Sequence, residues 1–369
     1  MRIAQISYSG FGGLGSVVFS LIAADEARAH HWQIGFIGDQ PLDASYPLRC
    51  EENFVDYAAF RSTPGRPYRA WLSLARWLGQ VKPDAVICHP VNSILACRWY
   101  SWRHGVRLVV VEHTPNQVKT RSEWAASRLS MLLADRIVVL TEEYREELSR
   151  AHGWLFNFRK VVVIPNGIDT AVFHPTRVPH ASVGKVVRLG MAARFSFSKR
   201  QDLLVKVMER LKVWRPALIV ELTFAGNGSE FERVMTLAAS SSTVSKIQFE
   251  GLLSEHEIAP WLRGLDIYVH ATDGETLSTS LLQAMATGLP IVASDIKGVR
   301  NLLGANEEFG RCVQNEADVF ALAILELVDD SARCTALGQR ARARILELYS
   351  QKTMLKSYLD LIQVDHDRP

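Results

Sequence analysis

Short strand-like runs alternate with helical runs throughout this chain of 369 residues. The strand-like runs are unbroken apolar stretches, such as the Leu-Val-Val-Val at residues 108–111, as expected for strands buried on both faces of a sheet. Alternation of such strands with helices is typical of parallel sheets covered by helices on both sides. The sequence therefore predicts an α/β fold. The expected strands are residues 2–8, 33–37, 85–88, 108–112, 136–140, 160–164, 186–192, 218–225, 247–250, 267–270 and 291–293.

The length of the chain suits two domains of about 180 residues each. Turn residues and prolines interrupt the alternation between residues 165 and 185, so we expect the linker there. We expect two Rossmann-like domains, residues 1–180 and 181–345, facing each other across a cleft, and a C-terminal helix and tail, residues 346–369, packed back on the first domain. In open parallel sheets ligands bind beyond the carboxyl ends of the strands, so functional residues should lie in the loops that follow strands.

The composition is ordinary for a globular protein, with 48% hydrophobic and 22% charged residues. No apolar run approaches the roughly 20 residues of a membrane-spanning helix. The five cysteines include no CxxC pair, which favours a reduced, cytoplasmic protein.

Basic and aromatic residues are concentrated between residues 61 and 128. Eleven Lys and Arg residues stand there against three acids, a local balance of 11 − 3 = +8, with seven Trp and Tyr residues among them. One interpretation is a solvated basic face over a core that holds the tryptophans. The other is contact with an anionic acceptor or an anionic membrane surface, so that the protein would be peripheral on the inner face of a membrane. No nucleic-acid-binding motif accompanies the charge, so nucleic acid is not an expected partner.

A glycine-rich loop, residues 9–15 (SGFGGLG), follows the first expected strand and opens a helix. Gly12 and Gly13 allow a tight turn, or the close approach of a phosphate or sugar to the backbone. A nicotinamide-dependent dehydrogenase is an alternative interpretation. The GxGxxG spacing fits it only loosely, however, and no acid ends the second strand to bind a ribose.

Three further polar segments directly follow expected strands. His113 could hydrogen-bond a sugar hydroxyl there, or be a structural histidine. Arg194 and Lys199 can neutralise a diphosphate, arginine as a fork and lysine as a point charge, or form a surface charge pair. Gly226 and Asn227 lie in a glycine turn that lets a flat base or a ribose approach.

Glu275 and Gln283 flank a loop suited to phosphate. Glu275 lies in a Gly-containing turn after a strand, and the helix that follows would direct its free N–H groups at an anion. The carboxylate can accept hydrogen bonds from vicinal hydroxyls. Gln283 follows eight residues later, slightly over two helical turns, so both side chains could address one ligand. The alternative is an ordinary helix start with a surface glutamine.

In their order and spacing these motifs resemble the family 4 retaining glycosyltransferases, which have the GT-B fold. The resemblance covers most of the chain and is strongest over residues 160–310. The segments that carry it are residues 134–141, 163–173, 224–228, 249–251 and 275–299, together with the Arg194/Lys199 pair.

The resemblance implies roles for the candidate site residues described above. Arg194 and Lys199 would hold the donor diphosphate, Glu275 would bond to the donor sugar, and His113 would contact the sugar from the first domain. The second acid of the family's paired-glutamate motif, which usually binds ribose hydroxyls, falls on Gln283. Glutamine keeps an acceptor oxygen but lacks the charge.

Backbone groups complete the implied donor site. Those around Leu277, Ser278 and Thr279 would bind the phosphate, and the loop at Gly251 and Leu252 would bind the base.

The implied reaction is that of a hexosyltransferase, which moves a sugar from a UDP- or GDP-type nucleotide-diphosphate sugar to a saccharide or lipid-linked acceptor, with retention at the anomeric carbon. Cell-surface polysaccharide or glycolipid synthesis is the expected context. We expect front-face attack, because no carboxylate is placed as a nucleophile. We expect the reaction to need neither a metal nor another cofactor. Gln283 motivates a second interpretation, a non-catalytic nucleotide-sugar-binding partner of a membrane glycan-synthesis complex.

Overall fold

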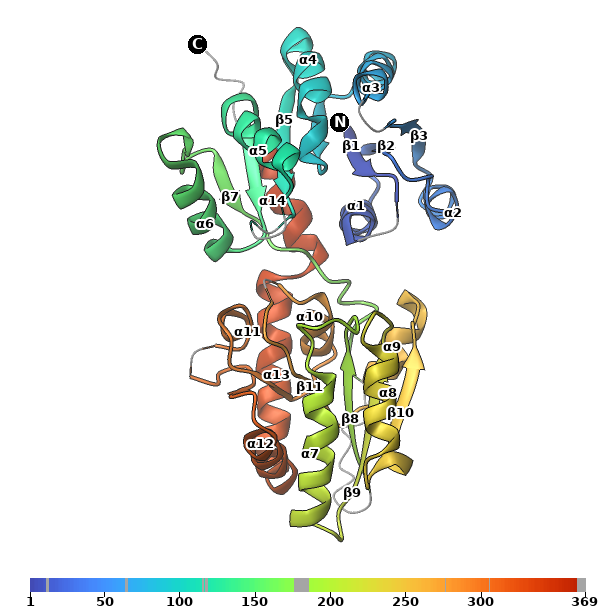
Figure 1. Ribbon diagram of the computed structural model, residues 1–369. Helices are drawn as coiled ribbons and strands as arrows, with labels where there is room; N and C mark the ends of the chain where they lie inside the picture. The colour runs from blue at the N-terminus through green and yellow to red at the C-terminus, as the bar shows by residue number, and fades with distance from the viewer. Residues whose placement is uncertain are drawn as a thin grey trace. The chain divides into compact units, whose positions relative to one another are not determined.

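The computed structural model describes residues 1–10, 13–63, 66–114, 116, 119–175, 186–275, 277–304 and 306–363. The chain forms two compact units, each described by itself below (Figure 1). Unit 1 comprises Met1–Gly167 together with Gln351–Pro369, and unit 2 comprises Ile168–Ser350. Gly12 and the part of the expected linker at residues 176–185 lie outside the described residues.

Unit 1 is built on a parallel sheet in which the described residues form seven strands, in the order β3-β2-β1-β4-β5-β6-β7. The strands are β1 (Arg2–Tyr8), β2 (His31–Gly38), β3 (Asp56–Arg61), β4 (Ala85–Cys88), β5 (Arg107–Glu112), β6 (Arg136–Val139) and β7 (Val161–Val163). The helices are α1 (Gly13–Ala24), α2 (Ser45–Glu52), α3 (Tyr68–Val81), α4 (Ile94–His104), α5 (Arg121–Leu133), α6 (Glu142–His152) and α14 (Gln351–Gln363), with short 3-10 turns η1 (Val91–Ser93) and η3 (Gly153–Leu155).

Unit 2 is built on a second parallel sheet, with six strands among the described residues in the order β10-β9-β8-β11-β12-β13. The strands are β8 (Val186–Ala192), β9 (Ile219–Ala225), β10 (Ile247–Gly251), β11 (Ile267–His270), β12 (Ile291–Ser294) and β13 (Arg311–Val313). The helices are α7 (Gln201–Trp214), α8 (Phe231–Ala239), α9 (Glu255–Arg263), α10 (Thr279–Ala286), α11 (Lys297–Leu303), α12 (Ala317–Asp329) and α13 (Ser331–Leu348), with the 3-10 turn η4 (Val244–Lys246).

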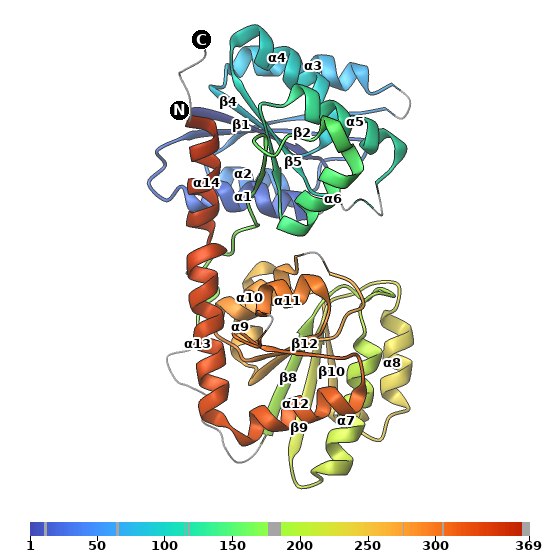
Figure 2. The same cartoon turned by 90° about the vertical axis from the view of Figure 1, so that its left-hand side faces the viewer.

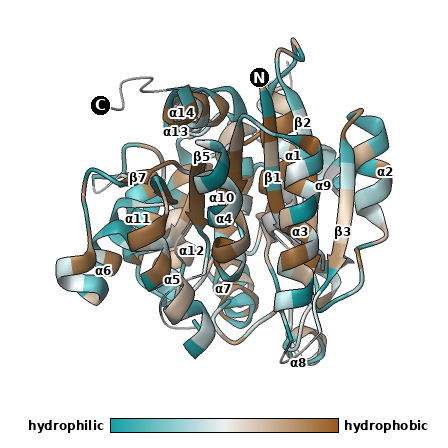
Figure 3. Ribbon diagram, turned by 90° about the horizontal axis from the view of Figure 1, so that it is seen from above, coloured by the Kyte–Doolittle hydropathy of each residue, from teal (hydrophilic) through white to brown (hydrophobic). Residues whose placement is uncertain are grey.

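Strand β5 shows why the strands read as unbroken apolar runs. Leu108 and Val110 lie in a core that includes side chains of α3 and α4, whereas Val109 and Val111 lie in a core that includes side chains of α1 and α14. All four are fully buried, and β1 and β5 are hydrophobic along most of their length (Figure 3). Because successive side chains of a strand point to opposite faces, a sheet covered on both faces needs an apolar residue at every position. The predicted α/β fold is confirmed.

Two strands were not predicted, and both lie at a sheet edge. In β3 the side chains are alternately exposed and half-buried, and β13 is only three residues long. An edge strand has a neighbour on one side only and is often short or polar, so it does not need an unbroken apolar run. The hydrophobic pattern that identifies central strands therefore does not identify these two.

Helix α14 belongs to unit 1 although all of unit 2 precedes it in the sequence. It lies beside α1 (Figure 2), and the Arg107 guanidinium of β5 donates a hydrogen bond to the Leu361 carbonyl at 3.1 Å. Its apolar side chains complete one of the two cores of unit 1; they are Met354, Leu355, Tyr358 and Ile362.

None of the helices in the described part of the chain has the length and apolarity that crossing a bilayer requires.

Candidate functional site

The loops that follow β8 and β9 are joined backbone to backbone. The Ala193 N–H donates to the Ala225 carbonyl at 3.0 Å, and the Phe195 N–H donates to the Asn227 carbonyl at 3.0 Å. At Gly226, φ is +135° and a Cβ atom would lie 2.1 Å from the Ala193 carbonyl oxygen. The contact between the two loops therefore requires glycine here, independently of any ligand.

Arg194 lies between the two residues that form these bonds, so its backbone is fixed while its side chain is exposed. The Asn227 side chain accepts a hydrogen bond from the Gly228 N–H at 2.7 Å and is therefore engaged within its own turn. Beside this turn, the Gly226 N–H donates to the Gly251 carbonyl at 2.6 Å, and Leu252 is 77% exposed. The predicted residues of these three loops thus gather at the carboxyl ends of β8, β9 and β10.

Lys199 and Glu275 form an ion pair at the carboxyl end of β11. Their side chains are only 14% and 17% exposed. The segments that carry them are bonded together, because the Asp273 N–H donates to the Ser198 carbonyl at 2.8 Å. Two residues 76 positions apart in the sequence, singled out for different roles, are therefore direct partners.

A third side chain, His270, lies behind this pair. It is the last residue of β11, is fully buried, and places its Nε2 3.5 Å from Glu275 Oε2. Neither ring nitrogen makes a well-aligned hydrogen bond in the described part of the chain. His270 is therefore a buried polar group that is aimed at Glu275 but not saturated by it.

The environment of Glu275 keeps it ionised. Burial opposes the charge, but the His270 ring and the Lys199 ammonium outweigh burial and lower the pKa of Glu275 to about 2. Burial also lowers the pKa of His270 below its usual value. At neutral pH Glu275 is therefore a carboxylate and His270 a neutral imidazole.

A polar network supports the turn that carries Glu275. The Thr272 N–H donates to Ser294 Oγ at 2.8 Å, and the Asn315 side-chain amide donates to the Thr272 carbonyl at 3.0 Å and to Asp273 Oδ1 at 2.8 Å. Arg200 Nη1 lies 3.3 Å from both carboxylate oxygens of Asp273. Backbone and side-chain groups of the turn are thus held from two sides.

Three members of this site were not predicted from the sequence, namely His270, Ser294 and Asn315. His270 ends β11, Ser294 ends β12, and Asn315 follows β13 by two residues. Polar residues at the carboxyl ends of strands were the signal that identified the other site residues, and the same signal applies to these three.

Helix α10 begins directly after the Glu275 turn. Ser278 is its N-cap; the hydroxyl is buried and accepts the backbone N–H three residues later at 3.4 Å. Thr279 is the first helical residue, Leu277 packs partly against the core, and Gln283 lies half-buried in the second turn. The free N–H groups of this helix start are therefore close in sequence to Glu275 and suited to an anion.

In unit 1, two histidines follow neighbouring strands. His89 follows β4 and His113 follows β5; the ring centroids are 5.3 Å apart, and His89 Nδ1 lies 3.0 Å from His113 Nε2. Burial lowers the pKa of His113 to about 4 and the pKa of His89 well below its usual value. Gly13 is the first residue of helix α1.

Lys119 does not contribute to the basic surface that the sequence predicts. Its Nζ lies 2.9 Å from Glu112 Oε2, and both side chains are fully buried. The ammonium also lies 4.9 Å from the centroid of Trp124 and 5.4 Å from that of Tyr144. When Lys119 and Glu112 are left out of the count, the charge balance of residues 61–128 is unchanged, 10 − 2 = +8.

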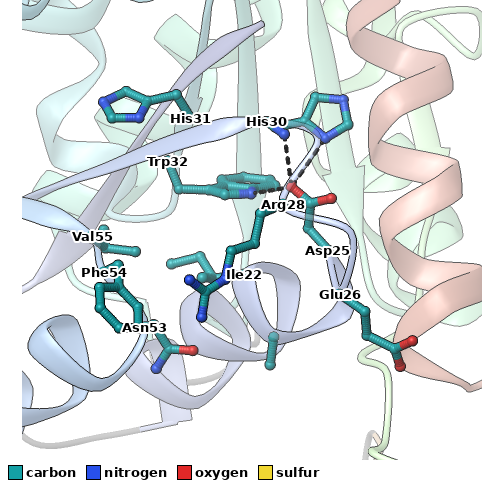
Figure 4. Close-up of a pocket in the computed structure, with 11 residues that line it drawn as sticks. Ile22, Asp25, Glu26, Arg28, His30, His31, Trp32, Asn53, Phe54 and Val55 are labelled. Atoms are coloured by element: carbon teal, nitrogen blue, oxygen red, sulfur yellow. Dashed lines mark hydrogen bonds and ion pairs between the residues drawn. The ribbon is translucent and has the colours of Figure 1, made fainter.

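A cavity of about 390 Å³ opens beside the first residues of β2 (Figure 4). Two acids, Asp25 and Glu26, line it, and Asp25 accepts hydrogen bonds from Trp32 Nε1 and from the His30 backbone, each at 3.0 Å. Across the cavity, the Arg28 guanidinium lies 4.4 Å from the ring centroid of Phe54. This cavity is at the amino end of the strand, opposite to the loops that carry the predicted site residues, and we assign it no role.

Within the described ranges, no group of three or more His, Cys, Asp or Glu side chains is placed to hold a metal ion.

Two family models match the chain in succession. The model named Glycosyltransferase Family 4 matches residues 11–172, and the model named Glycosyl transferases group 1 matches residues 175–344. The chain belongs to the family 4 glycosyltransferases. The first match falls on unit 1 and the second covers most of unit 2, including Lys199, Glu275 and Gln283.

Curated relatives of this family align with part of their length. The D-inositol 3-phosphate glycosyltransferase of Kineococcus radiotolerans is 28% identical over 235 residues, which are 57% of this chain and 53% of that protein. The lipopolysaccharide core biosynthesis glycosyltransferase LpsE of Rhizobium meliloti is 26% identical over 232 residues, 62% of this chain and 64% of that protein. The chain thus spans from about half to less than two thirds of the length of these relatives.

A solved structure is similar over the full length. The crystal structure of Anabaena Alr3699/HepE in complex with UDP and glucose has a TM-score of 0.79 and 16% sequence identity, covering 99% of this chain and 100% of that chain. At this identity the similarity shows the fold, which is the GT-B fold of this family.

Proposed function

We propose that this protein is a glycosyltransferase that transfers a sugar from a nucleotide-diphosphate sugar, with retention of configuration. The observation that carries the proposal is the Lys199–Glu275–His270 group, in which a buried histidine lies beside a partly buried ion pair at the start of α10. It offers an ionised acceptor for sugar hydroxyls and a cation for phosphate, next to a helix start that suits an anion, at one edge of the sheet. The solved relative is recorded with UDP and glucose, which supports a donor of the same chemical class.

The proposal gives the following roles to the predicted side chains of the site. Arg194 and Lys199 neutralise the donor diphosphate, Glu275 accepts hydrogen bonds from the sugar, and His113 contacts the sugar. Gln283 binds the ribose through its amide. Backbone groups bind the rest of the donor: those of Leu277, Ser278 and Thr279 the phosphate, and those of Gly226, Gly251 and Leu252 the base and ribose.

The proposed chemistry is a front-face substitution. The bond from the anomeric carbon to the diphosphate oxygen breaks, and the bond to the acceptor hydroxyl oxygen forms on the same face. The acceptor proton passes to the departing phosphate oxygen. Arg194 and Lys199 stabilise the charge that develops on the leaving group, where a fixed cation contributes most. No step requires a metal ion.

A thermal-shift screen over UDP-, GDP- and ADP-sugars tests donor binding, because a ligand that binds only the folded state raises its stability. We expect one of these donors to raise the melting temperature of the wild type, and Arg194→Ala and Lys199→Ala to abolish the rise. Lys206→Ala, an exposed lysine on α7, is the matched control and should respond as the wild type does. Normal binding by both site variants would overturn the phosphate assignment.

Turnover distinguishes an enzyme from a non-catalytic nucleotide-sugar-binding partner. We expect the protein alone to hydrolyse the bound donor slowly or to transfer its sugar to an acceptor. Donor binding with no turnover in the presence of saccharide and lipid-linked acceptors would favour the non-catalytic interpretation.

We propose further that the acceptor is lipid-linked and is met at an anionic membrane surface. One stripe of α4 supports this, because Leu95, Trp99 and Trp102 are 42%, 52% and 75% exposed at helical spacing. Arg103 is exposed along the same stripe, whereas Arg98 is half-buried and pairs with Asp135 at 3.5 Å; residues 66–107 carry seven bases and one acid, 7 − 1 = +6. Exposed tryptophans between arginines suit a headgroup layer.

Sedimentation with vesicles tests this surface. Vesicles that contain phosphatidylglycerol should retain the wild type at low salt, whereas vesicles of phosphatidylcholine alone should not. The double variant Trp99→Ala, Trp102→Ala should lose retention. Trp154→Ala removes a tryptophan that is 90% exposed elsewhere in unit 1 and should have no effect. Retention that ignores both lipid charge and the double variant would refute the membrane proposal.

A further inference from the structure

Two buried polar residues lie behind His113 in unit 1. Gln5, in the middle of β1, is 0% exposed, and His89 is 2% exposed. Their surroundings include apolar core residues, since Ile3, on the same face of β1 as Gln5, and Val18 of α1 belong to one core of unit 1. A buried amide or imidazole reduces stability unless its polar atoms are paired. The hydrogen bonds of these two residues are therefore well defined.

The direction of each bond follows from a fixed acceptor at one end. Gln5 Nε2 lies 3.2 Å from the Val18 carbonyl oxygen, which can only accept, so the amide nitrogen faces Val18. Gln5 Oε1 then faces His89 Nε2 at 3.1 Å and accepts from it. His89 therefore carries a hydrogen on Nε2.

The hydrogen position on His89 determines that on His113. A neutral imidazole has a single N–H, so the Nδ1 atom of His89 has a free lone pair and accepts. Its partner at 3.0 Å is His113 Nε2, which must donate. The hydrogen of His113 thus lies on Nε2, and Nδ1 is left as an acceptor. Burial supports two neutral rings, since it lowers the pKa of both histidines.

We propose that Gln5 and His89 are positioning residues that hold His113 as its Nε2–H tautomer, so that His113 Nδ1 accepts a hydrogen bond from a hydroxyl of the bound sugar. The sugar contact rests on the proposed glycosyl transfer, whereas the tautomer does not. A bare imidazole nitrogen accepts from a hydroxyl but cannot donate to a phosphate or carboxylate oxygen. The relay therefore selects a hydroxyl-bearing part of the substrate over an anionic one at this position.

Nitrogen chemical shifts test the tautomer directly. In the full chain labelled with ¹⁵N-histidine, long-range ¹H–¹⁵N spectra should show His113 with Nε2 protonated and Nδ1 bare; His113→Gln and His89→Gln assign the signals. Gln5→Leu removes the acceptor for His89 Nε2 and should give a mixture of tautomers at both rings. Cys88→Ala, a buried residue on the opposite face of β4, controls for loss of packing and should leave the tautomer unchanged. A wild-type His113 protonated on Nδ1, or a Gln5→Leu variant with a pure Nε2–H tautomer, would overturn the proposal.

Kinetics test whether the relay acts through His113. The donor for this test is the one of UDP-glucose, GDP-mannose and ADP-glucose that stabilises the protein. With it, His89→Leu should lower kcat/KM about tenfold. The affinity for the free nucleotide should stay within about twofold of the wild-type value. His89→Asn offers an oxygen near the position of Nδ1 and should restore part of the loss. In a His113→Gln background, His89→Leu should add no further loss.

These outcomes separate two kinds of failure. An equal loss from His89→Leu with and without His113 would show a merely structural role and overturn the relay. If the wild type turns over none of the three donors, the proposed glycosyl transfer fails, and the spectra still decide the tautomer.

Discussion

At the scale of single residues, the charge of Glu275 depends on its two neighbours, His270 and Lys199. A lone buried carboxyl group would be protonated more easily than in water, yet this one is held ionised by the Lys199 ammonium and the His270 ring. The donor-binding proposal requires an ionised acceptor at neutral pH. The structure thus provides the charge state as well as the position.

The lowered pKa makes folding stability depend on pH. Glu275 titrates near 4.5 in the unfolded chain and near 2 in the folded protein, so its contribution is fully present above pH 4.5 and is lost as pH falls towards 2. Between pH 6 and pH 3 it amounts to about 2 kcal/mol. In urea titrations, the free energy of unfolding should fall between pH 6 and pH 3 in both proteins, but by about 2 kcal/mol less in Glu275→Gln than in the wild type. Glu250→Gln, at an exposed carboxyl, is the control, and equal losses in Glu275→Gln and wild type would contradict the assignment.

Gln283 allows a second prediction at this scale. If its amide binds ribose hydroxyls, Gln283→Glu should strengthen the hydrogen bonds by introducing a charged acceptor, worth about 1 kcal/mol or roughly fivefold in donor affinity. Gln283→Leu should weaken donor binding. Isothermal calorimetry with the stabilising nucleotide sugar measures both changes. Unchanged affinities in both variants would place the ribose elsewhere.

At the scale of elements, the loops after β8 and β9 are hydrogen-bonded backbone to backbone, and this close contact is possible because Gly226 has no side chain. Gly226→Ala introduces a Cβ 2.1 Å from the Ala193 carbonyl oxygen at φ +135°, so the two loops must separate. We expect unit 2 to lose about 1–3 kcal/mol of stability and the donor affinity to fall through displacement of Arg194. Gly274→Ala, where a Cβ meets open space, is the comparison for both thermal unfolding and binding. A Gly226→Ala variant with normal affinity would show that Arg194 does not depend on this contact.

The sequence predicts central elements well and the partners of site residues poorly. Strand β5 could be located because Leu108–Val111 must be apolar on both faces, whereas β3 could not because an edge strand may be polar. Lys199 and Glu275 were each placed after a strand, but no local pattern shows that they pair, because their segments are neighbours only through the order of β8 and β11 in the sheet. Lys119 shows the same limit, since a lysine in a basic stretch gives no sign of a buried partner. The roles assigned to the site residues stay predictions.

At the scale of the whole molecule, helix α14 couples the last part of the chain to the first unit. Tyr358 is 1% exposed in the core of unit 1, and its hydroxyl has no hydrogen-bond partner among the residues that the structure describes. Tyr358→Ala should destabilise unit 1 by about 3–5 kcal/mol through the cavity it leaves. Tyr358→Phe removes an unpaired buried hydroxyl and should be neutral or stabilising.

Hydrogen exchange shows which unit is affected. With Tyr358→Ala, amides of β1 and β5 should exchange faster while those of β8 and β11 do not. Ile345→Ala, in the core of unit 2, should give the opposite pattern. Faster exchange of both units in either variant would mean that the two units unfold together.

The position of α14 in the sequence also determines when each unit can be completed on the ribosome. Synthesis of the 183 residues from Ile168 to Ser350 separates β7 from α14, so the helix that covers α1 follows about 10–40 s after the sheet of unit 1 has been made. During that interval the apolar faces of β5 and α1 are not yet covered by α14, whereas unit 2 can fold as soon as it emerges from the ribosome. A nascent chain of this protein therefore exposes these two faces to chaperones until α14 has been translated.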